Sequence, residues 1–563
     1  MTKSLELAEM IGRGFLPREL PPPFNSLAYG AYIKSLGGAR LPFDTTTRGF
    51  KTSVPEIYNL ARAGSFRREL SILNPIHFAA LADCIAAQWT QIAKLTESRL
   101  SLTSPTVSAE GRAITRRTSL DLLPRLRAEA RSQGRYLLKA DVNRFYPSIY
   151  THSIPWAAHG KAFAKANRGS EHWGNRVDLL MRNCQDAQTN GIPVGPDTSL
   201  VLAELLLTRV DRKLTRRRIK GLRYMDDYEL VFDSEKQALE ARTQLQQALL
   251  EFELNLSTTK TGVYPLPQQL EEPWVSSLNL FQLSERDPYF ETQVVRFFDR
   301  AFELARDFPQ EGVLKYAAGR IAKLRVAGER AELVENLLMQ CAQVEAGSLA
   351  FVLASMLKHP PATTHRRKRR HAMLLRIIAT HAPQRHSSEV AWAVWACIAM
   401  KLQLSRGATR AVLDMEDSVC CLLALHARRI GLVERPSDLN PLRSGMTAEA
   451  LHGPRWLLAY EANFKGWFQF RGANDFVASD RNFRRLKGAK VSFYDVSKTS
   501  LPEPPSPVER TSKVVDDYLS RITSDYDDAD DNGDEDEEDF SAEDVAERMR
   551  ELSRAKIPGP PGI

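Results

Sequence analysis

Apolar and polar residues alternate in residues 221–232, on both sides of the adjacent acids Asp226 and Asp227. Alternation with a period of two is typical of β-strands, and a short polar pair between two such runs is typical of a hairpin turn. We therefore expect a β-hairpin that carries the two acids at or near its turn. The apolar residues that define the pattern are Leu222, Tyr224, Leu230 and Phe232.

Another strand is expected upstream, where the apolar run Tyr136–Ala140 ends at Asp141. Two aromatic residues, Phe145 and Tyr146, and a turn follow it. If this strand neighbours the hairpin, its terminal acid adds a third carboxylate to the first two. The two segments together are therefore more informative than either one alone.

Further elements are expected around these strands. The basic run 66–75 is predicted to form a strand that ends at Pro75, and the prolines of residues 16–24 predict a stiff, extended segment. Residues 189–199 are rich in glycine and proline and predict a loop, after which Thr198 or Ser199 can cap a helix. Helical periodicity predicts helices at about 76–94, 200–210 and 234–252.

The pattern changes in the second half of the chain, where strand signals fade and helical ones recur from about 285 to 475. The loose spacing of about 35–40 residues predicts stacked helix pairs that resemble HEAT repeats. After residue 500, prolines and an acidic run at 525–547 predict a disordered tail. The predicted helices lie at 295–306, 313–324, 331–343, 348–357, 373–380, 390–402, 418–427 and 455–467.

The charge of the chain is unevenly distributed. The 563 residues carry a net charge of +8, although residues 525–547 alone hold 14 acids and no Lys or Arg, so the remainder carries +22. A body this basic is expected of a protein that binds a polymeric anion such as nucleic acid, although a merely basic surface is the alternative.

Cysteine usage and hydropathy indicate the compartment. The six cysteines are scattered without a Cys-x-x-Cys pair, which argues against zinc and favours a reducing environment. The sequence contains no apolar run of transmembrane length, and its N-terminus lacks the pattern of a signal peptide. We therefore expect a cytoplasmic location and no membrane partner.

The three acids indicate a chemistry. Adjacent carboxylates on a tight hairpin repel each other, and a divalent cation compensates that charge. With Asp141 beside them, Asp226 and Asp227 form a site for two Mg²⁺ ions, which can stabilise the attacking and leaving oxygens of a phosphoryl transfer. An ordinary Asp-rich turn is the alternative.

The sequence resembles reverse transcriptases in these segments. Residues 136–150 resemble motif A, and Tyr224-Met225-Asp226-Asp227 resembles the signature box of motif C. The resemblance implies that Asp141, Asp226 and Asp227 are catalytic and bind Mg²⁺, which Mn²⁺ can replace, with the backbone carbonyl of Val142 as a further ligand. It also implies a steric gate at Tyr146 that excludes the sugar 2′-hydroxyl, and contacts of Tyr224 and Met225 with the substrate.

The resemblance extends to other motifs over roughly residues 60–265. Pro193-Val194-Gly195 resembles motif B, which contacts template and incoming nucleotide, but departs from the common Pro-Gln-Gly form. Lys260 stands at the lysine of motif D, which implies a general acid for the departing pyrophosphate. Arg67 and Arg68 are expected in the fingers, where guanidinium groups pair with the triphosphate.

The form of motif A, Pro-Val-Gly-Pro and the helical second half together resemble prokaryotic abortive-infection, defence-associated reverse transcriptases. The resemblance implies phage defence, DNA synthesis from dNTPs that can be protein-primed and untemplated, and a homo-oligomer. It implies an α+β right-hand polymerase fold with fingers and palm, followed by an all-α HEAT-like domain. The expected divisions are 1–130 (N-terminal extension and fingers), 131–280 (palm), 285–495 (helical repeats) and 500–563 (linker and acidic tail).

Three alternatives stay open at this point. The chain could be a conventional reverse transcriptase that copies a bound non-coding RNA, or a catalytically silent scaffold that binds nucleic acid. The intact Asp141, Asp226 and Asp227 argue against the silent scaffold. It could also be an RNA-dependent RNA polymerase, against which the expected gate at Tyr146 argues.

Overall fold

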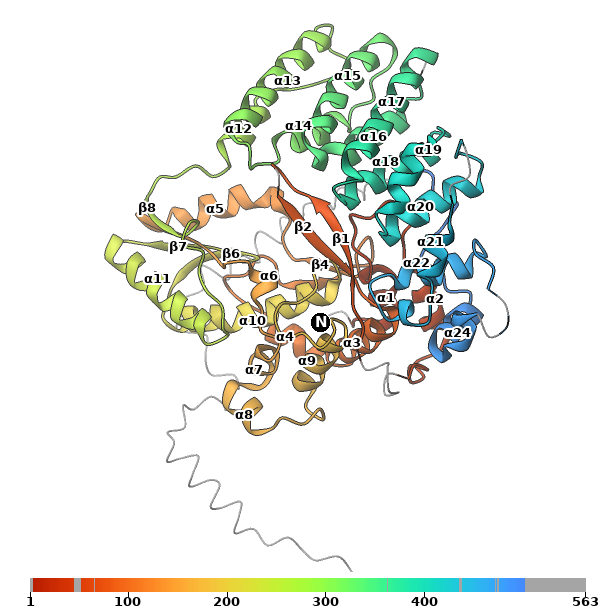
Figure 1. The fold of residues 1–563 in the computed structure, drawn as a ribbon. Coiled ribbons are helices and arrows are strands. Elements are labelled where there is room, and N and C mark those ends of the chain that lie inside the picture. Colours follow the sequence, from red (N-terminus) through yellow and green to blue (C-terminus); the bar gives the residue numbers. More distant parts are fainter. Residues whose placement is uncertain are drawn as a thin grey trace, which may run out of the picture.

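The computed structural model describes residues 4–501, except residues 45–51, 65, 362, 435–437, 471 and 473–474. The predicted acidic tail therefore lies outside the described residues. Two regions follow each other along the chain, a mixed α/β first half and an α-helical second half (Figure 1). No helix among the described residues combines the length and apolar character needed to cross a membrane.

A four-stranded antiparallel sheet lies at the centre of the first half, with the strand order β6-β7-β5-β8. The predicted hairpin is present as β6 and β7, and the predicted upstream strand is present as β5, which pairs with β7. At Gly221 a Cβ atom would lie 2.2 Å from the carbonyl oxygen of Glu229, so the close approach of β6 and β7 requires glycine. The strands are β5 (Tyr136–Asp141), β6 (Lys220–Tyr224), β7 (Asp227–Phe232) and β8 (Gly262–Pro265).

The two faces of this sheet are covered differently. Helix α11 (Glu235–Leu250) packs against one face, where Leu138 and Leu230 are fully enclosed. Helix α10 (Asp197–Arg216) reaches the sheet through its contacts with Arg223 and Tyr228. Helix α11 begins with a capping box formed by Ser234 and Gln237. On the other face, α5 (Leu123–Arg131) covers part of β6, and both Arg127 and Arg131 pair with Glu229. Asp141 and Asp227 form the last residue pair of the β5–β7 ladder, at one end of the sheet.

The N-terminal part is more ordered than the sequence predicted. The expected strand is β2, and the expected helix is divided into α3 and α4 at Gln88, while two unpredicted helices, α1 and α2, precede them. The proline-rich segment 16–24 is turned rather than extended: the amides of Leu20 and Phe24 bond the carbonyls of Pro17 and Pro21. These turns bury the apolar side chains between the prolines. The elements are α1 (Leu7–Gly14), α2 (Leu27–Ser35), β1 (Glu56–Ala61), β2 (Arg67–Ile72), α3 (Pro75–Ala87), α4 (Trp89–Leu95), β3 (Pro105–Val107), β4 (Ile114–Arg116), α6 (Phe145–Ser148), α7 (Ser153–His159), α8 (Lys161–Ala166) and α9 (Trp173–Asn183), with the short 3-10 helix η1 (Leu120–Leu122).

The second half contains a helix at each of the eight predicted segments, so its helical character is confirmed. Successive helices pack side by side, as in α13 with α14, α15 with α16 and α17 with α18, whereas the HEAT-like repeat stays a prediction. The helices are α12 (Pro273–Asn279), α13 (Phe290–Asp307), α14 (Val313–Ile321), α15 (Gly328–Val344), α16 (Leu349–Lys358), α17 (Thr364–His381), α18 (Ser387–Ala399), α19 (Arg406–Asp414), α20 (Ser418–Arg429), α21 (Asn440–Ser444), α22 (Trp456–Phe464), α23 (Phe476–Ser479) and α24 (Arg481–Gly488), with the 3-10 helices η2 (Ala346–Ser348) and η3 (Glu449–Leu451).

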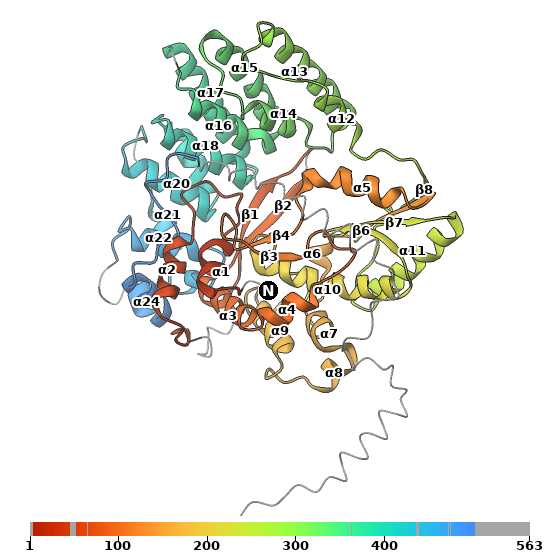
Figure 2. The same ribbon diagram turned by 180° about the vertical axis from the view of Figure 1, so that it is seen from behind.

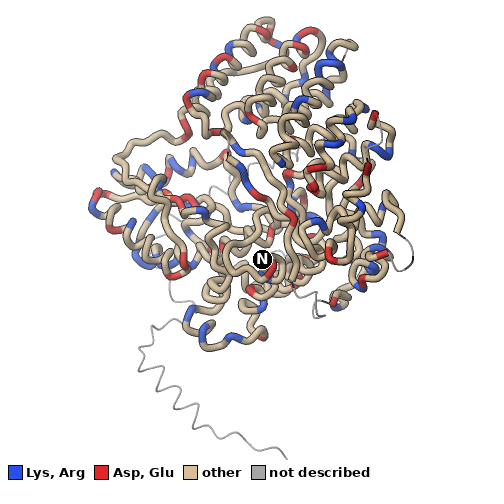
Figure 3. The backbone as a smooth tube through the Cα atoms, in the orientation of Figure 1, with Lys and Arg blue, Asp and Glu red and all other residues tan. Residues whose placement is uncertain are grey.

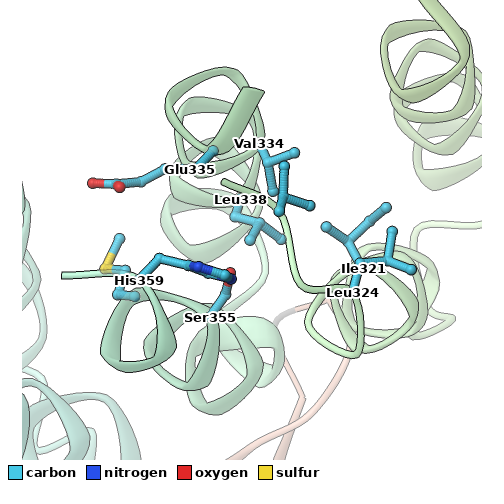
Figure 4. A pocket seen from close by; sticks show the side chains of 10 residues that line it. Ile321, Leu324, Val334, Glu335, Leu338, Ser355 and His359 are labelled. Carbon is cyan, nitrogen blue, oxygen red and sulfur yellow. The ribbon is translucent and has the colours of Figure 1, made fainter. Parts of the chain in front are cut away.

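These helices pack closely against each other. The cavity between α14, α15 and α16 has a volume of about 10 Å³, which is about the space that one water molecule needs (Figure 4). The carboxylate of Glu335 points away from the apolar side chains of this cavity and pairs with the buried Arg366 and Arg370. Two arginines of the basic block at 366–370 therefore belong to the interior of the helical region rather than to a solvated loop.

The helical half is docked on the β1–β2 hairpin and the N-terminal segment (Figures 1 and 2). Helix α18 packs against β1, the indole of Trp456 donates to the carbonyl of Ile72 at 3.2 Å, and Phe24 pairs with Tyr494. One continuous buried apolar cluster runs through the N-terminal helices, one face of the four-stranded sheet and the helical half. The apolar core is therefore continuous across the domain boundary expected near residue 285.

Candidate active site

Strand pairing brings the three predicted aspartates together. Asp141 lies opposite Asp227 in the β5–β7 ladder, and Asp227 lies opposite Tyr224 in the β6–β7 ladder, so Met225 and Asp226 form the turn. The amide of Val142 donates to the carbonyl of Asp226 at 3.2 Å, which ties the turn to the end of β5. Acids 85 residues apart in the sequence thus converge at one edge of the sheet.

The turn itself is held in an unusual conformation. Met225 has a φ of +60°, a region that costs a non-glycine residue of the order of 1–3 kcal/mol. Its amide donates to the hydroxyl of Thr103 at 3.1 Å. Its carbonyl accepts a hydrogen bond from Arg223 at 2.7 Å. The backbone amide and carbonyl of Met225 are therefore both held by hydrogen bonds, to Thr103 and Arg223.

Arg223 belongs to a buried charge cluster that the sequence analysis missed. Its guanidinium is fully buried and pairs with Glu204 at 2.9 Å and Asp211 at 2.7 Å. Ser101 and Thr103 donate to Glu204, and the hydroxyl of Tyr228 lies 3.0 Å from Asp211. The sequence contains one signal for this cluster: acids seven residues apart lie on the same face of a helix, here the face of α10 toward β6.

The three aspartates have no buried arginine among their described partners, and the exposed Lys260 reaches only Asp141. Burial and the neighbouring Asp141 raise the pKa of Asp226. Burial, with the charges of Asp226 and Asp141, raises the pKa of Asp227 to about 7. Both shifts mean that the ionised forms are disfavoured in the protein alone. Figure 3 shows acidic positions at the end of the β6–β7 hairpin and basic positions on the nearby β2.

This donor set fits a hard divalent cation. Clustered carboxylate oxygens are the ligands that Mg²⁺ prefers, and a cation removes the repulsion that adds to burial in raising these pKa values. Val142 is buried and its amide is already bonded to Asp226. Its carbonyl stays a predicted ligand.

Lys260 lies at the same site. Its Nζ is 3.1 Å from Oδ2 of Asp141, while its side chain is 69% exposed, so it reaches the acids from solvent. The segment that carries Lys260 is anchored to the end of β5, because the amide of Ser257 donates to the carbonyl of Asp141 at 2.7 Å. The structure thus places the predicted general acid beside the predicted metal ligands.

Tyr146 and Arg68 lie close enough to Asp226 to interact with it electrostatically. Burial and the charges of Glu204 and Asp226 raise the pKa of Tyr146, and Arg116 and Arg68 oppose this rise. The electrostatic influence of Asp226 also reaches Arg68, whose pKa is lowered by burial and by the neighbouring Arg62. Tyr224 accepts a hydrogen bond from Arg116 at 3.2 Å.

Arg67 is not available to a nucleotide in this structure. Its guanidinium binds Glu389 of α18 at 2.5 and 2.9 Å, and it also donates to Asn59. Adjacent residues of a strand point to opposite faces, so one of the two fingers arginines is turned toward the helical half. Arg68, in contrast, is within the electrostatic influence of Asp226.

The loop of Pro193 and Gly195 joins three parts of the fold. The carbonyl of Val194 accepts from the amide of Ser71 in β2, and that of Gly195 accepts from Arg112. Gly195 has a φ of +131°, and a Cβ there would lie 2.8 Å from the Pro17 ring, so only glycine fits. Contrary to expectation, neither Thr198 nor Ser199 caps the next helix, which begins at Asp197; the hydroxyl of Ser199 bonds the carbonyl of Pro193 instead.

Residues 80–275 match the family of the reverse transcriptase (RNA-dependent DNA polymerase). The matched segment contains all three aspartates and Lys260, and it ends within α12, where the helical half begins. No curated protein matches the chain. The match indicates nucleotide and nucleic-acid substrates, and enzymes of this class generally depend on divalent metal ions. The chain therefore contains a reverse transcriptase domain, and this domain indicates RNA-directed DNA polymerase activity by nucleotidyl transfer.

Proposed function

We propose that the protein is an antiviral, anti-phage reverse transcriptase that synthesises DNA from dNTPs, with protein-primed and template-independent synthesis. The observation that carries the polymerase activity is the pairing of Asp141 with Asp227 beside the Asp226 turn. The defence role is supported by the form of motif A, by Pro193-Val194-Gly195 and by the helical second half. Cytoplasmic location, homo-oligomerisation and HEAT-like repeats are part of this proposal.

Asp141, Asp226 and Asp227, with the carbonyl of Val142, would hold two Mg²⁺ ions, which Mn²⁺ can replace. When bound, these ions stabilise the negative charge on the attacking and leaving oxygens of the transferred phosphoryl group. The raised pKa values of Asp226 and Asp227 support the assignment, because they mark carboxylates whose ionised forms need a cation.

The other residues act on the nucleotide. Arg68 pairs with triphosphate oxygens, and Tyr146 excludes the 2′-hydroxyl of a ribonucleotide. A hydroxyl oxygen gives up its proton to water and forms the new bond to the α-phosphorus, while the bond from that phosphorus to pyrophosphate breaks and Lys260 donates a proton to the departing pyrophosphate. The attacking hydroxyl is a DNA 3′-hydroxyl or, in the first step, a tyrosine hydroxyl of the protein. Pro193 and Gly195 contact the incoming base.

The test is incorporation of labelled dNTPs by purified full-length protein with Mg²⁺, without added template or primer. Products are separated on a denaturing gel before and after protease treatment. Label that stays with the protein until digestion is the expected result. Product released without protease would contradict protein priming. The Asp226→Asn/Asp227→Asn variant is the control for catalysis by this site.

Other outcomes would redirect the proposal. Incorporation that requires added RNA and primer, or co-purifying RNA that matches the product, would establish the conventional templated activity. No incorporation under any condition would leave a silent nucleic-acid-binding scaffold. Equal use of NTPs and dNTPs would contradict the role of Tyr146 as a gate and indicate an RNA polymerase.

A further inference from the structure

Two histidines and a glutamate converge where α17 ends and α18 begins, outside the site described above. Nδ1 of His381 lies 3.0 Å from Nδ1 of His386, and these atoms lie 3.6 and 3.5 Å from Oε1 of Glu389. Among the described residues, this is the group of His, Cys, Asp and Glu side chains whose ligand atoms are close enough to share a metal ion.

The backbone brings these side chains together. The amide of His386 donates to the carbonyl of His381, and that of Arg385 donates to the carbonyl of Ala382, while Arg385 has a φ of +53°. These two bonds form a Schellman motif, which ends α17 and reverses the chain. Glu389 follows His386 by three residues, one turn along α18. The cluster is therefore set by helix geometry rather than by flexible loops.

The spacing of the three ligand atoms matches a metal site. Ligands of tetrahedral Zn²⁺ lie about 2.0–2.1 Å from the metal, so neighbouring ligand atoms are about 3.3–3.4 Å apart. The three observed distances lie on both sides of this value. Two ring nitrogens that face each other at 3.0 Å repel unless a proton or a cation lies between them.

The carboxylate of this cluster is held in position. Arg67 binds both oxygens of Glu389, and the hydroxyl of Ser388 donates to its Oε2 at 2.6 Å. Hydrogen bonds of this kind orient metal-binding carboxylates. Glu389 is nearly fully buried, whereas the side chains of His381 and His386 are 23% and 22% exposed, so an ion can enter from solvent.

We propose that His381, His386 and Glu389 bind a divalent transition-metal ion such as Zn²⁺, with water in the fourth position. The ion fastens the α17–α18 corner to the β1–β2 hairpin. Arg67 of β2 binds Glu389, and the hydroxyl of Ser388 accepts from the amide of Ala61 in β1 at 3.0 Å. Binding of metal thus stabilises the joint between the two halves of the protein.

The test uses full-length protein in the Asp226→Asn/Asp227→Asn background, so that ions bound at the aspartates are excluded. Co²⁺ is titrated while its visible d–d absorption is recorded, and Zn²⁺ affinity is measured by competition with a chromophoric chelator. We expect one equivalent of Co²⁺ with a tetrahedral spectrum, displaced by Zn²⁺. His386→Ala and His381→Ala should weaken Zn²⁺ binding by about tenfold or more.

His365→Ala is the matched control, because His365 is an exposed histidine on the same helix, α17. It should keep the Co²⁺ spectrum and the Zn²⁺-induced rise in Tm, and both should be lost in His386→Ala. Circular dichroism shows whether each variant is folded. Absence of the Co²⁺ spectrum in the Asp226→Asn/Asp227→Asn protein, or its retention when His386→Ala is added, would overturn the proposal. Because neither readout depends on nucleotide incorporation, the result is independent of the proposed polymerase function.

Discussion

Two groups of acids meet at the β6–β7 hairpin, one from helix α10 and one at the hairpin turn, and they differ in how their charge is balanced. Below the turn, Glu204 and Asp211 are buried with Arg223 between them, and this pairing lowers the pKa of Glu204 despite its burial. At the turn, Asp226 and Asp227 face Asp141, and their pKa values are raised. The buried acids are thus neutralised by an arginine of the protein, whereas the acids at the turn can be neutralised by a bound cation.

The comparison predicts separate effects on activity and stability. We expect Asp226→Asn/Asp227→Asn to reduce dNTP incorporation by about 10³-fold or more, because the oxygens that hold the ions are lost. The free energy of unfolding without metal should not fall, because the substitution also removes repulsion. Incorporation by the purified variant and chemical denaturation with EDTA measure the two effects.

Asp233→Asn is the matched control, because Asp233 is an exposed acid just after the same hairpin. It should leave both quantities unchanged. Residual synthesis by the double variant at more than about one hundredth of the wild-type rate would contradict the assignment of the metal ligands.

The opposite result is expected below the turn. Arg223→Met leaves Glu204 and Asp211 buried without a cation, which costs about 3–5 kcal/mol of stability. Denaturant unfolding measures the loss, and Arg217→Met, at an exposed arginine nearby, is the control. If Arg223→Met were as stable as the control, the buried cluster would not be what supports the Met225 turn.

Lys260 adds an exposed cation at the turn, where its Nζ contacts Asp141. Lys260→Ala should slow the chemical step about 10²-fold, the lower end of what a general acid contributes, with little effect on stability. Single-nucleotide incorporation over a range of pH measures this, with the exposed Lys236→Ala as control. A rate unchanged at every pH would exclude a proton-transfer role.

Arg67 and Arg68, the two arginines expected in the fingers, differ in a similar way, because Arg67 is paired with Glu389 and Arg68 is expected to bind the nucleotide. Arg67→Ala breaks the pairing with Glu389 and should cost about 1–3 kcal/mol of stability. Arg68→Ala should raise the KM for dNTPs about tenfold at unchanged stability, because it loses a charged contact with the triphosphate. Steady-state kinetics and thermal unfolding of both variants measure these two effects. Equal KM values for the two variants would contradict the assignment of Arg68 to the triphosphate.

These assignments mark how far the sequence could predict the site. The alternation around Asp226 and the apolar run that ends at Asp141 predicted the strands. Successive side chains of a strand point to opposite faces, so a local pattern of apolar and polar residues is enough to indicate one. Arg67 and Arg68 could not be told apart, because the partner of Arg67 lies 322 residues away on α18. Glu204 and Asp211 were missed because they interrupt an apolar helical run whose contact with β6 is a tertiary feature. The turns of residues 16–24 likewise depend on burial against distant aromatic residues.

The smallest expected effect concerns pH. The pKa of Asp227 is about 7 in the folded protein and near its usual value of 3.8 in the unfolded chain, so the folded state binds more protons between these values. The stability of the metal-free protein should therefore fall as the pH rises from about 4 to 7. Mg²⁺ binds the ionised carboxylates, so the rise in Tm on adding Mg²⁺ should be larger at pH 8 than at pH 5.5. Thermal unfolding with and without Mg²⁺ at both pH values measures this difference, and Asp227→Asn should reduce it. An equal rise at both pH values would mean that the charge at the turn is already balanced within the protein, as it is at Arg223.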